Sequence, residues 1–396
     1  MLDVVAMNEL AAAAAWSLTQ SANHPEAVRR GLSLPFEVQA WRSNGFSDSV
    51  ILQLQFDSKA YAIRSWPDRF DTPSKVEFWQ RTNADFSSVE FSLKEFGSLH
   101  DSPFPKLHHW QNVGQPSDAL FPFRSKQWTL CDWVEGKPIE GKCVDKTLVC
   151  HLATILARMH NSELFHLQAS QTESNLLIGQ FSSTAYQRMP SNSLRERLEA
   201  LKLVDYRWFA VVEQNRFFAN TSLDDRVKHC LAVIVERGTD WSRFVEICVG
   251  QTRHCHWVVR DLWRENILLD ESGRFSTIVD LGAARMDWPG LDFIRLFGSL
   301  TYGSKDSQNF KQDWSSNLWA DAYNTYTAHH PKHSIESLDE CKMLHHVSTG
   351  LSVLQWVKWI ESGVLGLKDP LQHKRVAQRL ACLCDQFLDD ADLLSK

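Results

Sequence analysis

The chain has 396 residues, of which 43% are hydrophobic and 23% charged, and a formal net charge of -6 at pH 7. This length and composition predict two or three structural units with sizeable cores. The acidic balance excludes the positive surface that nucleic-acid binding requires, and no stretch has the apolar length of a membrane span. Nine scattered cysteines, an odd number, favour reduced thiols in a cytoplasmic protein.

The first third of the chain is predicted to be a helix followed by an antiparallel sheet. Alternating apolar residues indicate the strands, and Thr72-Pro73 has the character of a helix start. In chain order we expect a helix over 1–33 that includes the alanine run 11–15, strands at 36–41, 50–56 and 60–64, helices from 72 to about 83 and over 87–96, a loop region with short strands over 100–126, and a strand at 127–136.

The remainder is predicted to be mainly helical. Apolar residues recur at helical spacing up to His160, which predicts an amphipathic helix that ends there. Further along we expect a polar stretch to about 193, helical runs over 194–219 and 224–248, a β-hairpin at 267–279, and helices beyond Asp292.

The most informative motif surrounds that hairpin. Asp261 is followed five positions later by Asn266, and Asp280 ends a short strand just ahead of Leu281-Gly282. An Asp that accepts a hydroxyl proton, with an Asn and a second Asp that hold magnesium against phosphates, is what phosphoryl transfer from Mg-ATP needs. We therefore predict Asp261 as the catalytic base and Asn266 and Asp280 as metal ligands.

The hairpin explains how these residues would meet. Residues 267–269 form a short apolar run, residues 275–279 form a second strand-forming run, and Gly273 lies in the turn between them. A hairpin brings its ends together, so Asn266 is expected beside Asp280, where two oxygen ligands suit magnesium. The alternative is an ordinary hairpin with a polar residue at each end.

A second constellation lies in the earlier strands. The turn at residues 44–49 reads Asn-Gly-Phe-Ser-Asp-Ser, and Asn44, Gly45, Ser47 and Ser49 are candidate phosphate contacts. Arg64 ends the third strand, where a cation could hold the ATP phosphates. A plain turn is the alternative for the 44–49 segment.

A carboxylate on the next helix could orient Arg64. Glu77 is our candidate, with Glu90 and Glu95 as rivals. A solvated helix glutamate is the alternative for Glu77.

These motifs together resemble the aminoglycoside phosphotransferase and choline kinase-like family, the small-molecule branch of the protein-kinase-like fold. The resemblance runs from about Phe36 to Ser299 and includes Tyr-Ala-Ile-Arg at 61–64, Thr-Leu-Cys-Asp-Trp-Val-Glu-Gly at 129–136 and Leu-Ala-Arg-Met-His at 156–160. It implies an α+β, bilobal fold with a small antiparallel-sheet N-lobe and a mainly helical C-lobe. The segment beginning at Pro289 resembles the family's helix start with a structural Asp, here Asp292.

The resemblance also sets the expected organisation. Residues 1–34 would be a helical extension, 35–136 the nucleotide-binding N-lobe, and 137–396 the C-lobe, which carries the catalytic loop and metal-site hairpin over 259–282. The hinge backbone near Asp132 and Val134 would bind adenine. No long activation segment follows Asp280, which favours a small-molecule acceptor over a protein.

The chain departs from the family pattern at three positions. Val259 stands where a loop-ordering His is usual, Arg64 replaces a Lys, and Leu281 replaces the Phe of protein kinases. The favoured hypothesis is an ATP- and Mg2+-dependent phosphotransferase acting on a small-molecule hydroxyl. The alternative is a pseudokinase, a nucleotide-binding module without turnover, and the sequence indicates neither the acceptor nor the oligomeric state.

Overall fold

Two compact units divide the chain. The structure, a computed structural model, describes residues 3–21, 36–41, 50–66, 71–87, 102–110, 118–139, 144–173, 188–300, 317–330, 335, 337–363 and 370–394. The first unit comprises Met1–Ile139 with Asp261–Ala284, and the second comprises Glu140–Arg260 with Arg285–Lys396. The hairpin segment, which we expected with the second part of the chain, thus packs with the first unit.

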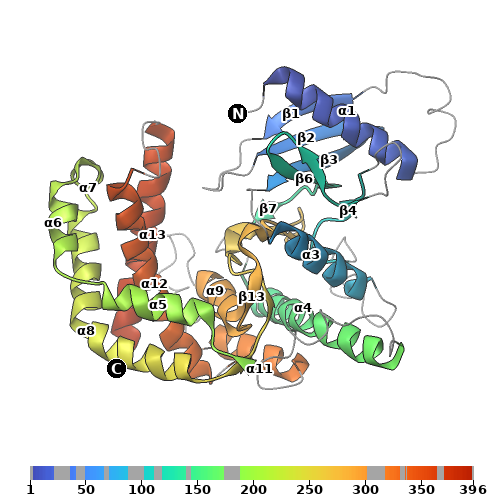
Figure 1. The fold of residues 1–396 in the computed structure, drawn as a ribbon. Helices are drawn as coiled ribbons and strands as arrows, with labels where there is room; N and C mark the ends of the chain where they lie inside the picture. Colours follow the sequence, from blue (N-terminus) through green and yellow to red (C-terminus); the bar gives the residue numbers. More distant parts are fainter. Residues whose placement is uncertain are drawn as a thin grey trace. The chain divides into compact units, whose positions relative to one another are not determined.

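An antiparallel sheet forms the centre of the first unit (Figure 1). Its strands follow the order β1-β2-β3-β6-β4, and β5 also pairs with β6. The predicted strands are confirmed with small changes at their ends. Their bounds are β1 Phe36–Trp41, β2 Ile51–Phe56, β3 Lys59–Trp66, β4 Leu107–His108, β5 Phe121–Phe123 and β6 Lys126–Asp132.

The N-terminal helix α1 (Val4–Ser21) covers the apolar face of this sheet (Figure 1). Ala11 and Ala14 are fully buried against strand residues such as Leu52 and Ile63. Alanine has no bulk beyond Cβ, so the alanine run lets the helix axis approach the sheet closely, and Leu10 and Leu18 are buried in the same core. The helix is described as far as Ser21, and the predicted continuation to residue 33 lies outside the described residues.

The predicted hairpin is present. It forms a separate small sheet with β7 (Lys137–Pro138), the strand that follows β6 in the chain. β11 (Ile267–Leu269) pairs with β12 (Phe275–Ile278), and Gly273 takes φ +79° in the turn. β7 pairs with the other edge of β11. A Cβ on Gly136 would lie 2.9 Å from the carbonyl oxygen of Leu269, so only glycine permits this approach. The hinge after β6 is therefore packed directly on the hairpin.

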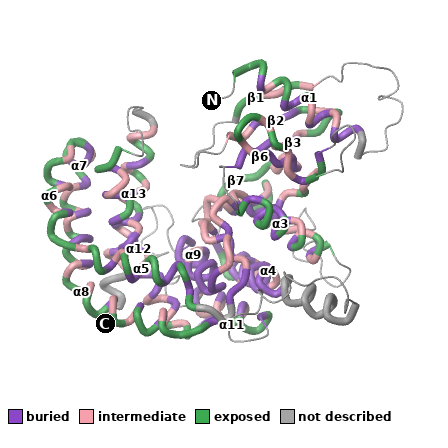
Figure 2. Tube along the Cα trace, viewed as in Figure 1, coloured by how far each residue is buried: buried purple, intermediate pink, exposed green. Residues whose placement is uncertain are grey.

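The second unit is helical with two small strand pairs, β8 with β9 and β10 with β13. Helix α9 contributes a strongly buried stretch to its core, coloured purple in Figure 2. The elements are α4 Lys146–Glu173, β8 Arg188–Met189, α5 Asn192–Lys202, α6 Arg207–Gln214, α7 Arg216–Thr221, α8 Asp224–Gly250, β9 Arg253–His254, β10 His256–Val258, β13 Arg285–Asp287, α9 Gly290–Leu300, α11 Trp319–His329, α12 Leu338–Glu361 and α13 Pro370–Leu394.

Helix ends account for most of the differences from expectation. Helix α4 continues past His160 to Glu173, so the predicted end was wrong. The predicted run 194–219 is three helices, α5 to α7. Asn215 separates α6 from α7, because it leaves helical geometry and caps α7 by accepting a hydrogen bond from Phe217 N. The helix expected over 87–96 lies almost wholly outside the described residues. The predicted α+β class, an antiparallel sheet followed by a helical part, is confirmed.

Among the helices in the described ranges, none is both long and apolar enough to cross a membrane.

We predict that Asp270→Asn destabilises the hairpin in a pH-dependent way. Asp270 Oδ1 accepts hydrogen bonds from Ser272 N and Arg274 N, both at 2.9 Å. Burial alone would raise the pKa of the Asp270 carboxyl, but hydrogen bonds from Ser272 and Arg274, together with the Arg274 charge, lower it to about 2. The stabilisation should be complete above about pH 4, the unfolded value, and be lost as the pH falls toward 2.

Urea unfolding of both proteins across pH 2–7 measures this effect. The stability difference should be largest near neutrality and shrink toward pH 2. Glu271→Gln, at an exposed neighbouring position, is the control and should show no such convergence. A constant difference across the range would contradict the assignment.

Candidate functional site

The catalytic-loop residues and the hairpin lie together within the first unit. Asn266 ends the short helix η3 (Arg264–Asn266), and its carbonyl accepts a hydrogen bond from Val279 N at 2.8 Å. Asp280 is the next residue after Val279, so the open end of the hairpin, opposite the Gly273 turn, places Asn266 beside it, as the sequence predicts. The Asn266 Nδ2 donates to the carbonyl of Asp261 at 2.7 Å. This bond uses the amide nitrogen and leaves the amide oxygen as the possible ligand for a cation.

Asp261 is held by a tryptophan that the sequence analysis did not single out. The indole Nε1 of Trp263 donates to Asp261 Oδ1 at 2.7 Å. Both residues are half-buried. One carboxylate oxygen is fixed by this bond and the other can accept a proton. The sequence offered one indication of this contact, which is that Trp263 lies two residues after the predicted base.

Asp280 and Arg64 form an ion pair across the unit. Asp280 takes the left-handed conformation, with φ +65°, and begins the short helix η4 (Leu281–Ala283). Arg64, 8% exposed, lies in β3 opposite Thr129 of β6, and its guanidinium lies over the ring of Trp66 at 5.0 Å. The predicted phosphate-binding cation and the predicted metal ligand are thus in direct contact.

Glu77 does not meet Arg64. It lies on the exposed face of α3 (Thr72–Phe86) and pairs with Arg81 one turn further on. The buried face of this helix instead presents Lys75, whose Nζ donates to the carbonyl of Gly282 at 2.7 Å. The predicted orientation of Arg64 by Glu77 is therefore corrected, because helical periodicity directs position 75 inward and position 77 outward. The rivals Glu90 and Glu95 lie outside the described residues.

The remaining predicted nucleotide contacts are placed in part. Asp132 N donates to the carbonyl of Lys106 at 2.9 Å, and its carboxylate pairs with His108 Nε2 at 2.6 Å. Val134 is half-buried in the segment that joins β6 to β7. The phosphate-loop residues Asn44, Gly45, Ser47 and Ser49 lie outside the described residues.

In the second unit, a buried carboxylate anchors the residues just before the catalytic loop. Asp292 is fully buried and accepts hydrogen bonds from Val259 N and Arg260 N, both at 2.7 Å. His160 lies 3.4 Å from the same carboxylate and 2.8 Å from the hydroxyl of Tyr326. Arg260 has φ +63°, a costly conformation for a side chain that these bonds can maintain. The backbone at Val259 is therefore fixed without a histidine at that position.

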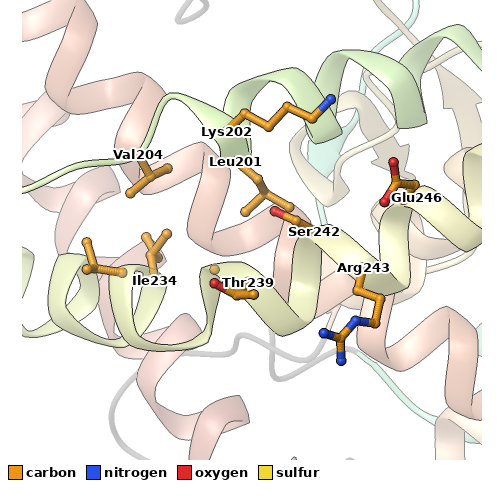
Figure 3. Close-up of a pocket in the computed structure, with 10 residues that line it drawn as sticks. Leu201, Lys202, Val204, Ile234, Thr239, Ser242, Arg243 and Glu246 are labelled. Carbon is orange, nitrogen blue, oxygen red and sulfur yellow. The ribbon is translucent and has the colours of Figure 1, made fainter.

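A cavity of about 450 Å³ lies elsewhere in the second unit. Residues of α5, the turn after it and α8 line it, among them Lys202, Thr239, Arg243 and Glu246 (Figure 3). None of its lining residues belongs to the predicted nucleotide or metal site. We therefore assign it no role in phosphate chemistry.

Comparison with known families decides the class of the protein. The model of a family described as the phosphotransferase enzyme family matches residues 84–326, more than half of the chain. The chain belongs to this phosphotransferase family. The predicted enzyme class, a phosphotransferase, is thus confirmed, as is the resemblance on which it rested. No curated protein matches the sequence.

The chain is similar to several solved structures, and one of them, with a TM-score above 0.5, supports the fold. A Ralstonia eutropha protein assigned as an aminoglycoside phosphotransferase has 10% identity and a TM-score of 0.51, covering 96% of this chain and 97% of its own. A spectinomycin phosphotransferase bound to ADP and spectinomycin has 10% identity, coverage of 89% and 95%, and a TM-score of 0.48. The ethanolamine kinase of Plasmodium vivax has 13% identity, coverage of 95% and 88%, and a TM-score of 0.45.

The donor set fits the cation and phosphates that such a phosphotransferase would handle. Asp280 offers a carboxylate and Asn266 an amide oxygen, which are ligands that magnesium accepts alongside phosphate oxygens. Arg64 Nε is buried without a hydrogen-bond partner among the described residues. A buried donor without a partner is costly, and an incoming phosphate oxygen would satisfy it.

We predict that Asp292→Asn loosens the start of the catalytic loop. The amide retains one oxygen, so one of the two N–H groups from Val259 and Arg260 would face an NH2 group. An unsatisfied buried donor costs on the order of 1–3 kcal/mol.

Chemical denaturation should show this loss for Asp292→Asn. Asp339→Asn, at an exposed position in the first turn of α12, should leave the unfolding free energy within about 0.5 kcal/mol of wild type. Equal stability of the two variants would show that Asp292 does not carry the anchor.

Proposed function

We propose that the protein is an ATP- and magnesium-dependent phosphotransferase that moves the γ-phosphate to a hydroxyl of a small molecule. The observation that carries this proposal is the arrangement of Asp261, Asn266 and Asp280 at one end of the hairpin, in a chain of the phosphotransferase family. The pairing of Arg64 with Asp280 supports it, because a phosphate-binding cation belongs beside the metal ligand.

Each residue has a distinct part in the proposed reaction. Asp261 accepts the proton of the acceptor hydroxyl. The oxygen of that hydroxyl forms a bond to the γ-phosphorus while the bond between this phosphorus and the bridging oxygen of ADP breaks. Trp263 keeps the Asp261 carboxylate in one orientation. Asn266 and Asp280 would hold magnesium, which when bound neutralises charge on the phosphates. Arg64 adds a permanent positive charge, and the segment around Asp132 and Val134 would bind adenine.

The phosphate loop at 44–49 remains part of the proposal. Asn44, Gly45, Ser47 and Ser49 would contact the phosphates through backbone N–H groups and hydroxyls. The joined strands β1 and β2 are paired in register from Phe36 with Phe56 to Trp41 with Ile51. This register brings the two ends of the loop together.

The pseudokinase alternative rests on Val259 and Arg64. A histidine at position 259 would be expected to order the loop. Here the Asp292 carboxylate orders it by accepting hydrogen bonds from the backbone N–H groups of Val259 and Arg260. Arg64 keeps the charge that a lysine would supply and contacts Asp280. Both observations favour turnover over its loss.

We also propose a reducing compartment, such as the cytoplasm. None of the eight cysteines in the described residues forms a disulfide, and most of them are buried. Buried reduced thiols are typical of proteins in compartments where disulfides are rare.

The direct test is acceptor-dependent ADP formation. Purified protein is incubated with ATP and Mg2+ against a panel of amino sugars, amino alcohols and neutral sugars, and products are checked by mass. Stimulation by one compound, lost when EDTA removes the metal, is the expected result. Nucleotide binding without any acceptor-dependent ADP would instead favour the pseudokinase alternative.

We predict that Asp261→Asn lowers kcat about 10²–10⁴-fold, the range for losing a general base, while ATP affinity persists. Steady-state kinetics and calorimetric titration of the nucleotide measure the two quantities. Asp205→Asn, at an exposed position, is the control and should match wild type. A kcat near the wild-type value would show that Asp261 is not the base.

We predict that Arg64→Ala lowers kcat/KM for ATP. The corresponding rise in activation free energy should be on the order of 2–4 kcal/mol. Adenosine affinity should stay unchanged, because adenosine lacks the phosphates. Arg64→Lys should recover part of the loss, since it restores the charge without the planar fork.

The control for Arg64 is Arg124→Ala, which removes an arginine from the same unit that pairs with Asp3 at the surface. It should leave kcat/KM unchanged. Equal effects of Arg64→Ala and Arg124→Ala would sink the phosphate role.

A further inference from the structure

Lys75 is a buried lysine in the first turn of α3. It is 2% exposed, whereas lysines are almost never fully buried unless they are paired. Its ammonium group lies 3.0 Å from Asp71 Oδ2 and donates to the carbonyl of Gly282 at 2.7 Å. Burial of this charge therefore needs a specific reason.

Asp71 alone does not supply that reason. Its side chain is 48% exposed, so a lysine at the helix surface could pair with it in water and avoid the cost of desolvation. The Gly282 carbonyl is the partner that draws the ammonium group inward. A charged donor on a backbone carbonyl makes one of the stronger hydrogen bonds in proteins.

Gly282 lies in the same turn as Asp280, and it also contacts the ion pair between Asp280 and Arg64. A Cβ built on Gly282 would lie 3.2 Å from Asp280 Oδ1 and 3.2 Å from Arg64 Nη2. The Gly282 backbone thus packs on the Asp280–Arg64 pair. Two cations from different elements hold the turn: Arg64 of β3 binds the carboxylate and Lys75 of α3 binds the carbonyl two residues later.

We infer that Lys75 is a positioning residue for Asp280, holding the turn 280–282 against α3 so that the carboxylate is placed to bind the metal. This inference rests on the proposed function. From the sequence we expected a glutamate of this helix to orient Arg64 of the strand. Here the helix contributes the cation, and the strand cation bonds Asp280 directly.

A set of four variants separates this role from a merely structural one. Lys75→Met removes both bonds of the ammonium group, whereas Lys75→Arg keeps a charged donor. Asp71→Asn removes the ion pair but keeps the bond to Gly282. Arg81→Met, on the exposed face of the same helix, is the matched control for loss of a cation.

The first measurement needs no nucleotide. Amide hydrogen exchange at Gly282 and Ala284 reports on the turn, since Ala284 N donates to the Leu281 carbonyl at 3.1 Å. Exchange there should rise about tenfold or more in Lys75→Met and less in Lys75→Arg. It should stay at the wild-type rate in Asp71→Asn and Arg81→Met.

The second measurement is calorimetric titration of a non-hydrolysable ATP analogue with and without Mg2+. The gain in affinity on adding Mg2+ should fall on the order of tenfold in Lys75→Met, while the Mg2+-free affinity is unchanged. Lys75→Arg should restore part of the gain. Asp71→Asn should keep all of it.

Each outcome has a defined meaning. Unchanged exchange and an unchanged Mg2+ gain in Lys75→Met would overturn the inference, as would an equal loss in Asp71→Asn, which would reduce Lys75 to an ion-pair partner. If Lys75→Met does not fold, Lys75→Leu, which also removes both bonds, carries the same test. If wild-type protein shows no Mg2+-dependent nucleotide binding, the proposed function fails, and the exchange data alone uphold or overturn the role of Lys75.

Discussion

The antiparallel pairing of β11 with β12 fixes the spacing between the loop that carries Asp261 and the turn that carries Asp280. Ile267 pairs with Ile278, so Asn266 and Val279 meet at the end of the ladder. A shift by one residue would move Ile267 and Leu269, the buried residues of β11, to the opposite face and separate these groups. β12 is buried along its whole length. The chemistry of the site depends on that register before it depends on any individual side chain.

Two ion pairs lie beside this hairpin. Arg64 pairs with Asp280, and Lys75 pairs with Asp71. Each cation therefore has a carboxylate partner, and Lys75 also donates to the carbonyl of Gly282. These contacts hold the segment 280–282 to β3 and α3 of the same unit.

Sequence reasoning identified the parts of the fold that follow from local pattern. The strands, the hairpin and its turn at Gly273 were predictable because alternating apolar residues and turn residues determine them locally. Helix ends were harder to predict. The polar stretch after His160 does not indicate that α4 continues to Glu173, because intrinsic helix propensity is only a weak prior.

The predicted site shows the same division. Asp261, Asn266 and Asp280 were predicted from their spacing, which is a property of the chain, and the structure brings them to one end of the hairpin. Glu77 was chosen for its chemistry, but which face of α3 points inward depends on packing, and the inward residue is Lys75. Trp263 was missed because its indole reaches Asp261 through a bond that only the folded loop displays.

The arginine in β3 has a consequence for chemical labelling. Electrophilic nucleotide analogues that acylate an amine at this position of a strand need a nucleophile with a free electron pair. The guanidinium of Arg64 stays protonated at all ordinary pH values and offers none. Such reagents, if the proposed nucleotide site binds them, would leave Arg64 unmodified. Covalent profiling that relies on an amine at this strand position would therefore not report the proposed site through Arg64.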